Sequence, residues 1–153
     1  MAGASVAFTY NSNPALAARL EKRFSKITKC KAYKVDISSE DEIKKTVQTM
    51  VKDFGRIDVL VNNAGIWKEG GISKMKLSAW EETLRTNLTS TFIFTQQAVH
   101  FMKIKRYGKI INISSTAGQR GEAHYSHYAA SKGGMISFTK SLASELGPFN
   151  INV

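Results

Sequence analysis

Residues Ile57–Gly65 read IDVLVNNAG, and this stretch decides the fold. Its first five residues, Ile57–Val61, are apolar except for Asp58, and so short an apolar run is typical of a strand covered on both faces. The run ends in asparagines and small residues, Asn62–Gly65, where small side chains let a ligand approach the backbone. The stretch therefore predicts a buried strand with a binding loop at its carboxyl end.

Strand and helix patterns alternate on both sides of this stretch. Further strands are predicted at Ser5–Tyr10, Ala32–Val35, Lys109–Ile113 and from Ile151 to Val153. This alternation predicts an α/β fold, a Rossmann-like doubly wound parallel sheet with right-handed crossovers and helices on both faces. In such sheets ligands bind at the carboxyl ends of the strands, so the loops after the strands are the candidate binding loops.

Capping residues place the first two helices. Asn13 caps a helix with Pro14 at its first position, where proline costs least. Ser39 and Glu42 form a capping box for a second helix, and Gly55 ends it.

Two longer helices are predicted in the second half of the chain. After a further capping box, Ser78 and Glu81, a long helix runs from about Leu88 to Arg106, and another runs from Ser126 to Leu146. The first of these has apolar stripes on two sides, so we expect it to be buried against its own sheet and against a partner. The stripes comprise Phe94, Ala98 and Phe101 on one side, and Thr91, Thr95, Val99 and Met102 on the other.

The composition bounds the class of protein. The chain has 153 residues, of which 42% are hydrophobic, as is ordinary for a globular domain. No apolar run approaches the roughly 20 residues that a membrane span needs, and no signal peptide is recognisable. The single cysteine, Cys30, cannot form an intrachain disulfide. We therefore expect a cytoplasmic protein with no membrane partner.

The net charge is +10, from 22 Lys and Arg residues against 12 Asp and Glu residues. A nucleic-acid binder is one explanation of such an excess. The basic residues are spread along the chain, however, and the densest group, Lys103, Lys105 and Arg106, lies at a predicted helix end, where cations favour the helix dipole. We expect no nucleic-acid partner and assign the excess to attraction of a polyanionic cofactor.

The residues with the clearest chemistry are Tyr128 and Lys132 in the sequence YAASK, with Ser115 upstream at the end of a predicted strand. Residues four apart lie on one face of a helix. A lysine cation beside a tyrosine favours the phenolate and so lowers the tyrosine pKa from its usual value of about 10. Ser115 would hydrogen-bond a substrate oxygen while Tyr128 exchanges its proton, which suits interconversion of a carbonyl and an alcohol.

Simpler interpretations of these residues stay open. YAASK would also open a helix, with its serine bonded locally. Asn87 is a plausible polar site of the long helix. Asp36 follows a predicted strand, where its carboxylate would accept from an adenine amino group or cap the following helix.

Four motifs stand out: NNAG, the asparagine of NLTSTF, the second serine of INISS, and YAASK. Their order and separations resemble those of the short-chain dehydrogenase/reductase family. The resemblance covers essentially the whole chain and is closest to the 3-oxoacyl-carrier-protein reductase-like and carbonyl reductase branches. It implies an oxidoreductase in which Ser115 orients the substrate carbonyl, Tyr128 is the acid/base, and Lys132 lowers the pKa of Tyr128 and binds the nicotinamide ribose. Asn87 would hold a water of the proton relay.

The resemblance also implies a dinucleotide cofactor. Asn63, Ala64 and Gly65 would flank the adenosine ribose and the central strand, with Asp36 and Ile37 at the adenine. NAD enzymes commonly have an acidic residue at the end of the strand corresponding to Ser5–Tyr10. Here Tyr10, Asn11 and Ser12 are neutral and tolerate a 2′-phosphate, so we expect NADP, with NAD less favoured.

The sequence departs from the family at both ends. The family's glycine-rich turn, of the TGxxxGxG type, has no counterpart, and the family continues beyond the strand that starts at Ile151. We therefore expect residues 1–153 to be one partial dinucleotide-binding domain that lacks the first strand and helix and the C-terminal strands. In the order 3-2-1-4-5-6 that first strand lies between Ser5–Tyr10 and Ile57–Val61, so both should have free edges, and the chain alone should not turn over substrate.

The remaining candidates line a pocket rather than bind metal. Glu122, His124 and His127 fit no standard metal spacing, so we expect no metal. His124, Tyr125 and His127 lie between Ser115 and Tyr128 and, with Trp67, are candidates for the wall of a substrate pocket.

The preferred hypothesis is an NADP-dependent carbonyl reductase or alcohol dehydrogenase acting on a small carbonyl or alcohol substrate. The alternative is a non-catalytic structural module of the same fold. In either case we expect a homodimer or homotetramer through helices 88–106 and 126–146.

Overall fold

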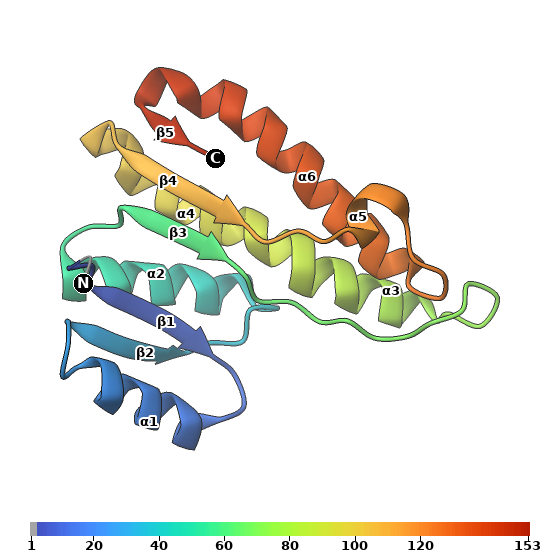
Figure 1. Ribbon diagram of the computed structural model, residues 1–153, viewed down its shortest axis with the longest axis horizontal. Helices are drawn as coiled ribbons and strands as arrows, with labels where there is room; N and C mark the ends of the chain where they lie inside the picture. Colours follow the sequence, from blue (N-terminus) through green and yellow to red (C-terminus); the bar gives the residue numbers. More distant parts are fainter. Residues whose placement is uncertain (1–2) are drawn as a thin grey trace. The chain divides into compact units, whose positions relative to one another are not determined.

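Helices and strands alternate in the computed structural model, which describes residues 3–153 (Figure 1). The α/β class is therefore confirmed. The first elements are β1 (Val6–Tyr10), α1 (Pro14–Phe24), β2 (Cys30–Lys34), α2 (Glu40–Phe54), β3 (Val59–Asn62) and α3 (Leu77–Leu84). They are followed by a π-helical turn (Arg85–Thr89), α4 (Ser90–Lys105), β4 (Gly108–Asn112), α5 (Ala117–Arg120), α6 (Ser126–Leu146), a 3₁₀ turn (Gly147–Phe149) and β5 (Ile151–Asn152).

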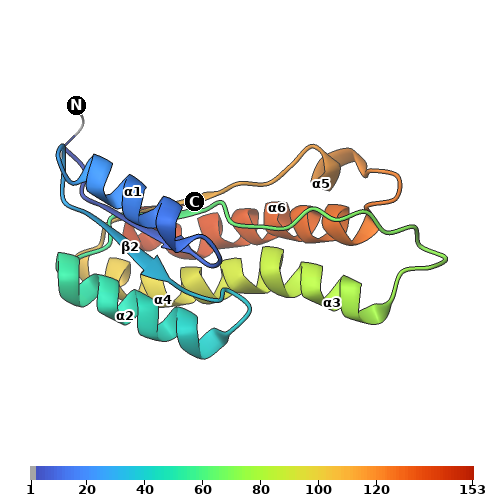
Figure 2. The same cartoon turned by 90° about the horizontal axis from the view of Figure 1, so that it is seen from below.

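The chain divides into two compact units, the first up to Arg56 and the second from Ile57 to Val153. In the first unit β1 and β2 pair in parallel, with Val6 opposite Cys30 and Tyr10 opposite Lys34. Helices α1 and α2 lie on opposite sides of β2 (Figure 2), so helices on both faces of the sheet are confirmed for this unit.

The caps of the first unit follow the sequence closely. The Asn13 side chain accepts a hydrogen bond from the Leu16 amide at 2.9 Å, with Pro14 at the first helical position. Ser39 accepts from the Glu42 amide at 3.4 Å. The Glu42 carboxylate, however, accepts from the Asp36 amide at 2.8 Å, so Glu42 fixes the exit of β2 instead of closing the capping box.

The second unit holds a parallel sheet in the order β3-β4-β5. Ala98 and Met102 of α4 and Leu142 and Leu146 of α6 pack with strand residues Ile110 and Ile151 to form its core. Gly108 is needed there, because a Cβ at this position would lie 2.4 Å from the Met102 sulfur. Both long helices thus cover one face of this sheet.

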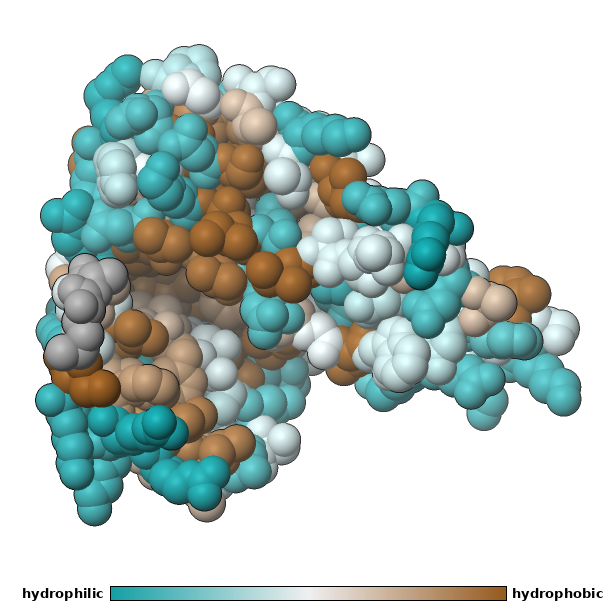
Figure 3. Space-filling view, viewed as in Figure 1, coloured by the Kyte–Doolittle hydropathy of each residue, from teal (hydrophilic) through white to brown (hydrophobic). Residues whose placement is uncertain are grey.

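The other face of β3 and β4 is apolar and exposed. Val59, Val61, Ile111 and Ile113 are 40–53% exposed, and Figure 3 shows apolar side chains gathered over these strands. The prediction that Ile57–Val61 is covered on both faces is therefore wrong for this chain. The cause is that α4 and α6 both pack on the face formed by the alternate side chains, among them Leu60 and Ile110.

The strand edges match the expected topology. Among the described residues β1 pairs with β2 alone, and β3 pairs with β4 alone. The edges of β1 and β3 are the two that were predicted to be free.

The long helix begins earlier than predicted. Helix α3, the π-helical turn and α4 follow one another without a break from Leu77 to Lys105, so a start near Leu88 is wrong. Lys76 is the N-cap residue and no side chain caps α3, so the predicted Ser78–Glu81 capping box is wrong as well. The hydroxyls of Thr83, Ser90 and Thr91 donate to carbonyls one turn earlier, which lets these polar residues stay inside a helix.

Helix α4 buries Thr91, Thr95, Ala98 and Met102 along one side, and near its start it also buries Ser90 and Ile93, which lie on another side. Phe92 remains 46% exposed. Burial of a second side against a partner stays a prediction. Helix α6 has the predicted bounds, whereas the short α5 was not predicted. No helix within residues 3–153 has the length and apolar character needed to cross a membrane.

Candidate active site

Tyr128 and Lys132 lie one turn apart near the start of α6. The Lys132 ammonium nitrogen is 5.8 Å from the centroid of the Tyr128 ring. Lys132 is only 4% exposed, and its ammonium donates to the Ile113 carbonyl at 2.7 Å. Burial lowers the pKa of Lys132. A largely desolvated ammonium is thus held close to the Tyr128 ring.

Ser115 lies three residues past the end of β4, two residues after Ile113. Its hydroxyl oxygen accepts from the Ala117 amide at 3.2 Å, and its side chain is partly exposed. The adjacent Ser114 hydroxyl donates to the Lys132 carbonyl at 2.9 Å. Gly118 packs so tightly on α6 that a Cβ there would lie 2.6 Å from the Lys132 carbonyl carbon. These contacts fix the segment of Ser115 against the first turns of α6.

Asn87 is fully buried in the π-helical turn between α3 and α4. Its side-chain oxygen accepts from the Ile66 amide at 2.7 Å, and its side-chain nitrogen donates to the Ile66 carbonyl at 2.9 Å. The same nitrogen donates to the Ser131 hydroxyl at 3.1 Å. π-Helical turns frequently occur at functional sites, and this one aims Asn87 at the loop after β3.

Gly65 lies close to the side chains of both Asn87 and Lys132. A Cβ on Gly65 would lie 3.0 Å from the Asn87 side-chain oxygen and 3.8 Å from the Lys132 ammonium. Asn63 and Ala64 are exposed after the end of β3. The structure therefore brings Gly65, Asn87 and Lys132 into one cluster, with Tyr128 one turn away on α6.

The remaining predicted cofactor residues belong to the first unit. Tyr10, Asn11 and Ser12 follow one another at the carboxyl end of β1, and Asp36 and Ile37 follow β2. The Asp36 carboxylate accepts from the Ser38 hydroxyl at 2.7 Å and the Ser38 amide at 2.9 Å, which lowers the pKa of Asp36. Asp36 thus orders the turn before α2 but does not cap that helix, because the N-cap residue is Ser39.

A buried polar chain at the strand ends was not predicted. Asn62 donates to Thr95 at 3.1 Å and to Asn112 at 2.8 Å, and Asn112 donates to Thr139 at 2.9 Å. The chain joins α4, β3, β4 and α6 just before the loops that hold the site. Its signal in the sequence is an asparagine at the end of each of two apolar runs, IDVLVN and KIIN.

Trp67 and Tyr125 link the loop after β3 to the loop before α6. Their rings stack with centroids 4.6 Å apart and an interplanar angle of 4°, and the Gly70 amide donates to the His124 carbonyl at 2.8 Å. Burial and the carboxylates of Glu69 and Glu122 raise the pKa of Tyr125.

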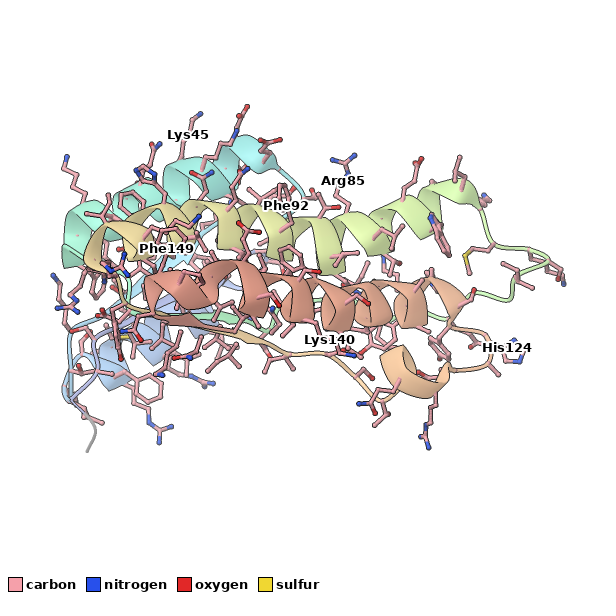
Figure 4. The ribbon with its side chains drawn as sticks, turned by 90° about the horizontal axis from the view of Figure 1, so that it is seen from above. Lys45, Arg85, Phe92, His124, Lys140 and Phe149 are labelled. Atoms are coloured by element: carbon pink, nitrogen blue, oxygen red, sulfur yellow. The ribbon has the colours of Figure 1, made fainter. Side chains whose placement is uncertain are left out.

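His124 and His127 lie close together in the sequence but differ in their exposure to solvent. His124 lies at the tip of its loop and points outward (Figure 4), whereas His127 is 1% exposed and its Nδ1 has no hydrogen-bond partner. A buried His127 does not line an open pocket, so that part of the pocket prediction is wrong. In the part of the chain that the structure describes, no group of three or more His, Cys, Asp or Glu side chains could hold a metal ion.

Known proteins resemble the chain along its whole length. The family profile described as short chain dehydrogenase matches residues 1–153. A 3-oxoacyl-[acyl-carrier-protein] reductase of Aquifex aeolicus is 39% identical over 153 residues, which cover 99% of this chain and 62% of that protein. Nodulation protein G of a Rhizobium species is 42% identical over 80% of this chain and 50% of its own length. An acetoacetyl-CoA reductase of Shinella zoogloeoides is 40% identical over 94% of this chain and 58% of its own length.

The chain thus spans between half and 62% of the length of these curated relatives. The match to the family profile runs through both units, and the motifs that suggested the family lie in the cluster around Lys132. The chain belongs to the short chain dehydrogenase family.

Proposed function

We propose that the protein carrying this chain is an NADP-dependent oxidoreductase that interconverts a carbonyl and a secondary alcohol. The observation that supports it best is the buried Lys132 ammonium beside Tyr128, fixed by the Ile113 carbonyl at the exit of β4. Relatives named as 3-oxoacyl-[acyl-carrier-protein] reductase and acetoacetyl-CoA reductase support a 3-oxoacyl thioester as substrate.

In the proposed reaction the chain's own residues handle the proton and the substrate oxygen. The Ser115 hydroxyl donates a hydrogen bond to the substrate carbonyl oxygen. Tyr128 gives its phenolic proton to that oxygen as the alcohol forms, and the Lys132 cation stabilises the resulting phenolate. In the reverse direction Tyr128 takes the proton from the alcohol.

The residues fit a nicotinamide cofactor, which when bound supplies or accepts the hydride. Gly65 leaves room for close backbone approach, because even a Cβ there would crowd Asn87. Lys132 would hold the nicotinamide ribose, and Asn63, Ala64 and Gly65 would flank the adenosine ribose. We further propose that both units form one dinucleotide-binding domain, with Asp36 and Ile37 at the adenine.

The choice of NADP rests on Tyr10, Asn11 and Ser12. Tyr10, Asn11 and Ser12 themselves carry no carboxylate that would repel a 2′-phosphate. The free cysteine, Cys30, fits a reducing compartment, and the proposal places the protein in the cytoplasm.

Self-association through α4 and α6 is part of the proposal. A groove of about 350 Å³ lies between these helices and is lined by apolar side chains that include Phe92, Val99, Phe138 and Leu142. The rings of Phe92 and Phe138 meet edge to face with centroids 6.4 Å apart. A second copy of the same face would cover them.

The experiment that tests the function measures oxidation of NADPH and of NADH by the intact protein that carries this chain, each with acetoacetyl-CoA as the carbonyl substrate. The proposal expects consumption that depends on the ketone and is faster with NADPH. Consumption with NADH alone would contradict the cofactor, and no consumption with either would contradict the reaction.

A further inference from the structure

Ser131 of α6 lies between Tyr128 and Lys132 in the sequence and is fully buried. Its hydroxyl donates to the Tyr128 carbonyl at 2.7 Å and accepts from the Asn87 side-chain nitrogen at 3.1 Å. One small side chain therefore contacts two parts of the proposed site that come from different elements.

On the Asn87 side, the amide has a complete set of partners. Two of its hydrogen bonds go to the backbone of Ile66, so they tie Asn87 to the loop of Gly65. The third goes to Ser131 and ties the same asparagine to α6. Removing the Ser131 hydroxyl would leave one N–H of a buried amide unpaired, and an unpaired buried donor costs free energy that movement of Asn87 would relieve.

On the α6 side, the bond from Ser131 to the Tyr128 carbonyl fixes the hydroxyl within the turn that separates Tyr128 from Lys132. This turn is also where the Lys132 ammonium reaches the Ile113 carbonyl and passes 3.8 Å from the position of a Cβ on Gly65. A movement of Asn87 relative to this turn would change the distance and orientation between Gly65 and the Lys132 ammonium.

We propose that Ser131 is a positioning residue for the carbonyl–alcohol interconversion. It acts through Asn87, by holding the loop of Gly65 in register with the turn that carries Tyr128 and Lys132. The inference rests on the proposed function, since positioning has a kinetic meaning only for that reaction. Catalysis is sensitive to such register, because misplacement by about 1 Å can cost as much as a hundredfold in rate.

Ser131→Ala is the direct test, measured on the enzyme with NADPH bound. We expect kcat to fall about tenfold, the equivalent of roughly 1.4 kcal/mol, while the KM for NADPH changes less than about twofold. Ser90→Ala is the matched control. Ser90 is also buried, and its hydroxyl donates to the Thr86 carbonyl of its own helix, so its loss should leave kcat within about twofold of wild type.

A double-mutant cycle with Asn87→Ala separates positioning from general destabilisation. If Ser131 acts through Asn87, its removal has little further effect on kcat once Asn87 is gone. Fold-changes that multiply in the double variant, or a Ser131→Ala kcat within twofold of wild type, would overturn the inference.

A measurement that does not depend on enzyme activity distinguishes the positioning role of Ser131 from the proposed function. Hydrogen exchange of the Asn87 side-chain amide, followed by NMR, should be faster in Ser131→Ala than in wild type, and unchanged exchange would overturn the inference. A wild-type enzyme that shows no ketone-dependent NADPH oxidation would refute the proposed function, and the positioning role with it. An active wild type with an unaffected Ser131→Ala would refute the positioning role alone.

Discussion

At the scale of single residues, the buried lysine dominates the electrostatics of the site. Lys132 is 4% exposed, and desolvation lowers the pKa of its ammonium below the usual value of 10.5. Burying a cation next to one carbonyl acceptor opposes folding, because desolvation of an ion costs more than a single hydrogen bond returns. The proposed role of Lys132 beside Tyr128 therefore comes at some expense in stability.

Lys132→Met should therefore be at least as stable as wild type at pH 7, although it loses activity. The sign of the pH dependence follows from the lowered pKa. As pH rises through the folded-state pKa toward about 10.5, the folded wild type releases its proton before the unfolded chain does, so the free energy of unfolding of wild type rises relative to the variant.

Urea unfolding of both proteins at pH 7 and at pH 10 measures this difference. Lys140→Met is the control, because Lys140 is exposed on the same helix (Figure 4) and should show no such trend. A difference between wild type and Lys132→Met that stays constant with pH would contradict this account of the site.

At the scale of elements, strand ends and helix faces are joined by the polar chain through Asn62, Thr95, Asn112 and Thr139. Each of the three side-chain amide hydrogen bonds in this chain joins two different elements, so the chain fixes α4 and α6 relative to β3 and β4. Networks of paired polar side chains inside a fold make that fold specific.

Asn112→Ala should lower the free energy of unfolding by about 1–3 kcal/mol, because it removes an acceptor of Asn62 and a donor to Thr139 inside the fold. Chemical unfolding measures the change. Asn152→Ala is the matched control: Asn152 accepts from Lys109 in an exposed pair, and its loss should cost less than about 0.5 kcal/mol. Equal losses in the two variants would show that the buried chain contributes nothing specific.

Local signals were enough to predict most elements. The periodicity of α6 gave its bounds, and Asn13 and Ser39 cap the helices where expected. The start of the long helix was missed, because Lys76 is the N-cap residue of α3 without a side-chain hydrogen bond and so leaves no local signal at Leu77.

The residues of the candidate site could be predicted from the sequence, whereas the hydrogen bonds that join them could not. Sequence motifs picked out Gly65, Asn87 and Lys132, and the structure brings these three together. The roles of Ser131 and of the Asn62 chain depend on hydrogen bonds across distant segments, which no local pattern specifies. His127 looked like a pocket residue because it lies beside Tyr128, but adjacent helix residues point in different directions and His127 points inward.

For the whole molecule, the exposed apolar side chains beside the groove between α4 and α6 are the reason to expect self-association. Phe92 is 46% exposed beside the groove between α4 and α6. Large apolar patches on proteins usually mark interaction surfaces. A homodimer through this face would bury Phe92 and Phe138 together with the groove.

Phe92→Glu should therefore weaken self-association by a factor of ten or more, because a buried interface would have to desolvate a carboxylate. Sedimentation equilibrium measures the change. Ile104→Glu is the control: Ile104 is 73% exposed on the same helix and does not line the groove, so self-association should persist. Unchanged association of Phe92→Glu, or no association of wild type, would contradict a dimer through this face.

Tyr128 is the residue proposed to exchange the proton in the carbonyl–alcohol interconversion. The most direct measurement compares kcat for ketone-dependent NADPH oxidation in wild type, Tyr128→Phe and Tyr125→Phe. Tyr128→Phe keeps the ring and removes the proton donor, so kcat should fall by a factor of about 10² to 10⁴ with NADPH binding retained. Tyr125→Phe keeps the ring that stacks on Trp67 and should stay close to wild type. Turnover by Tyr128→Phe at the wild-type rate would contradict the account.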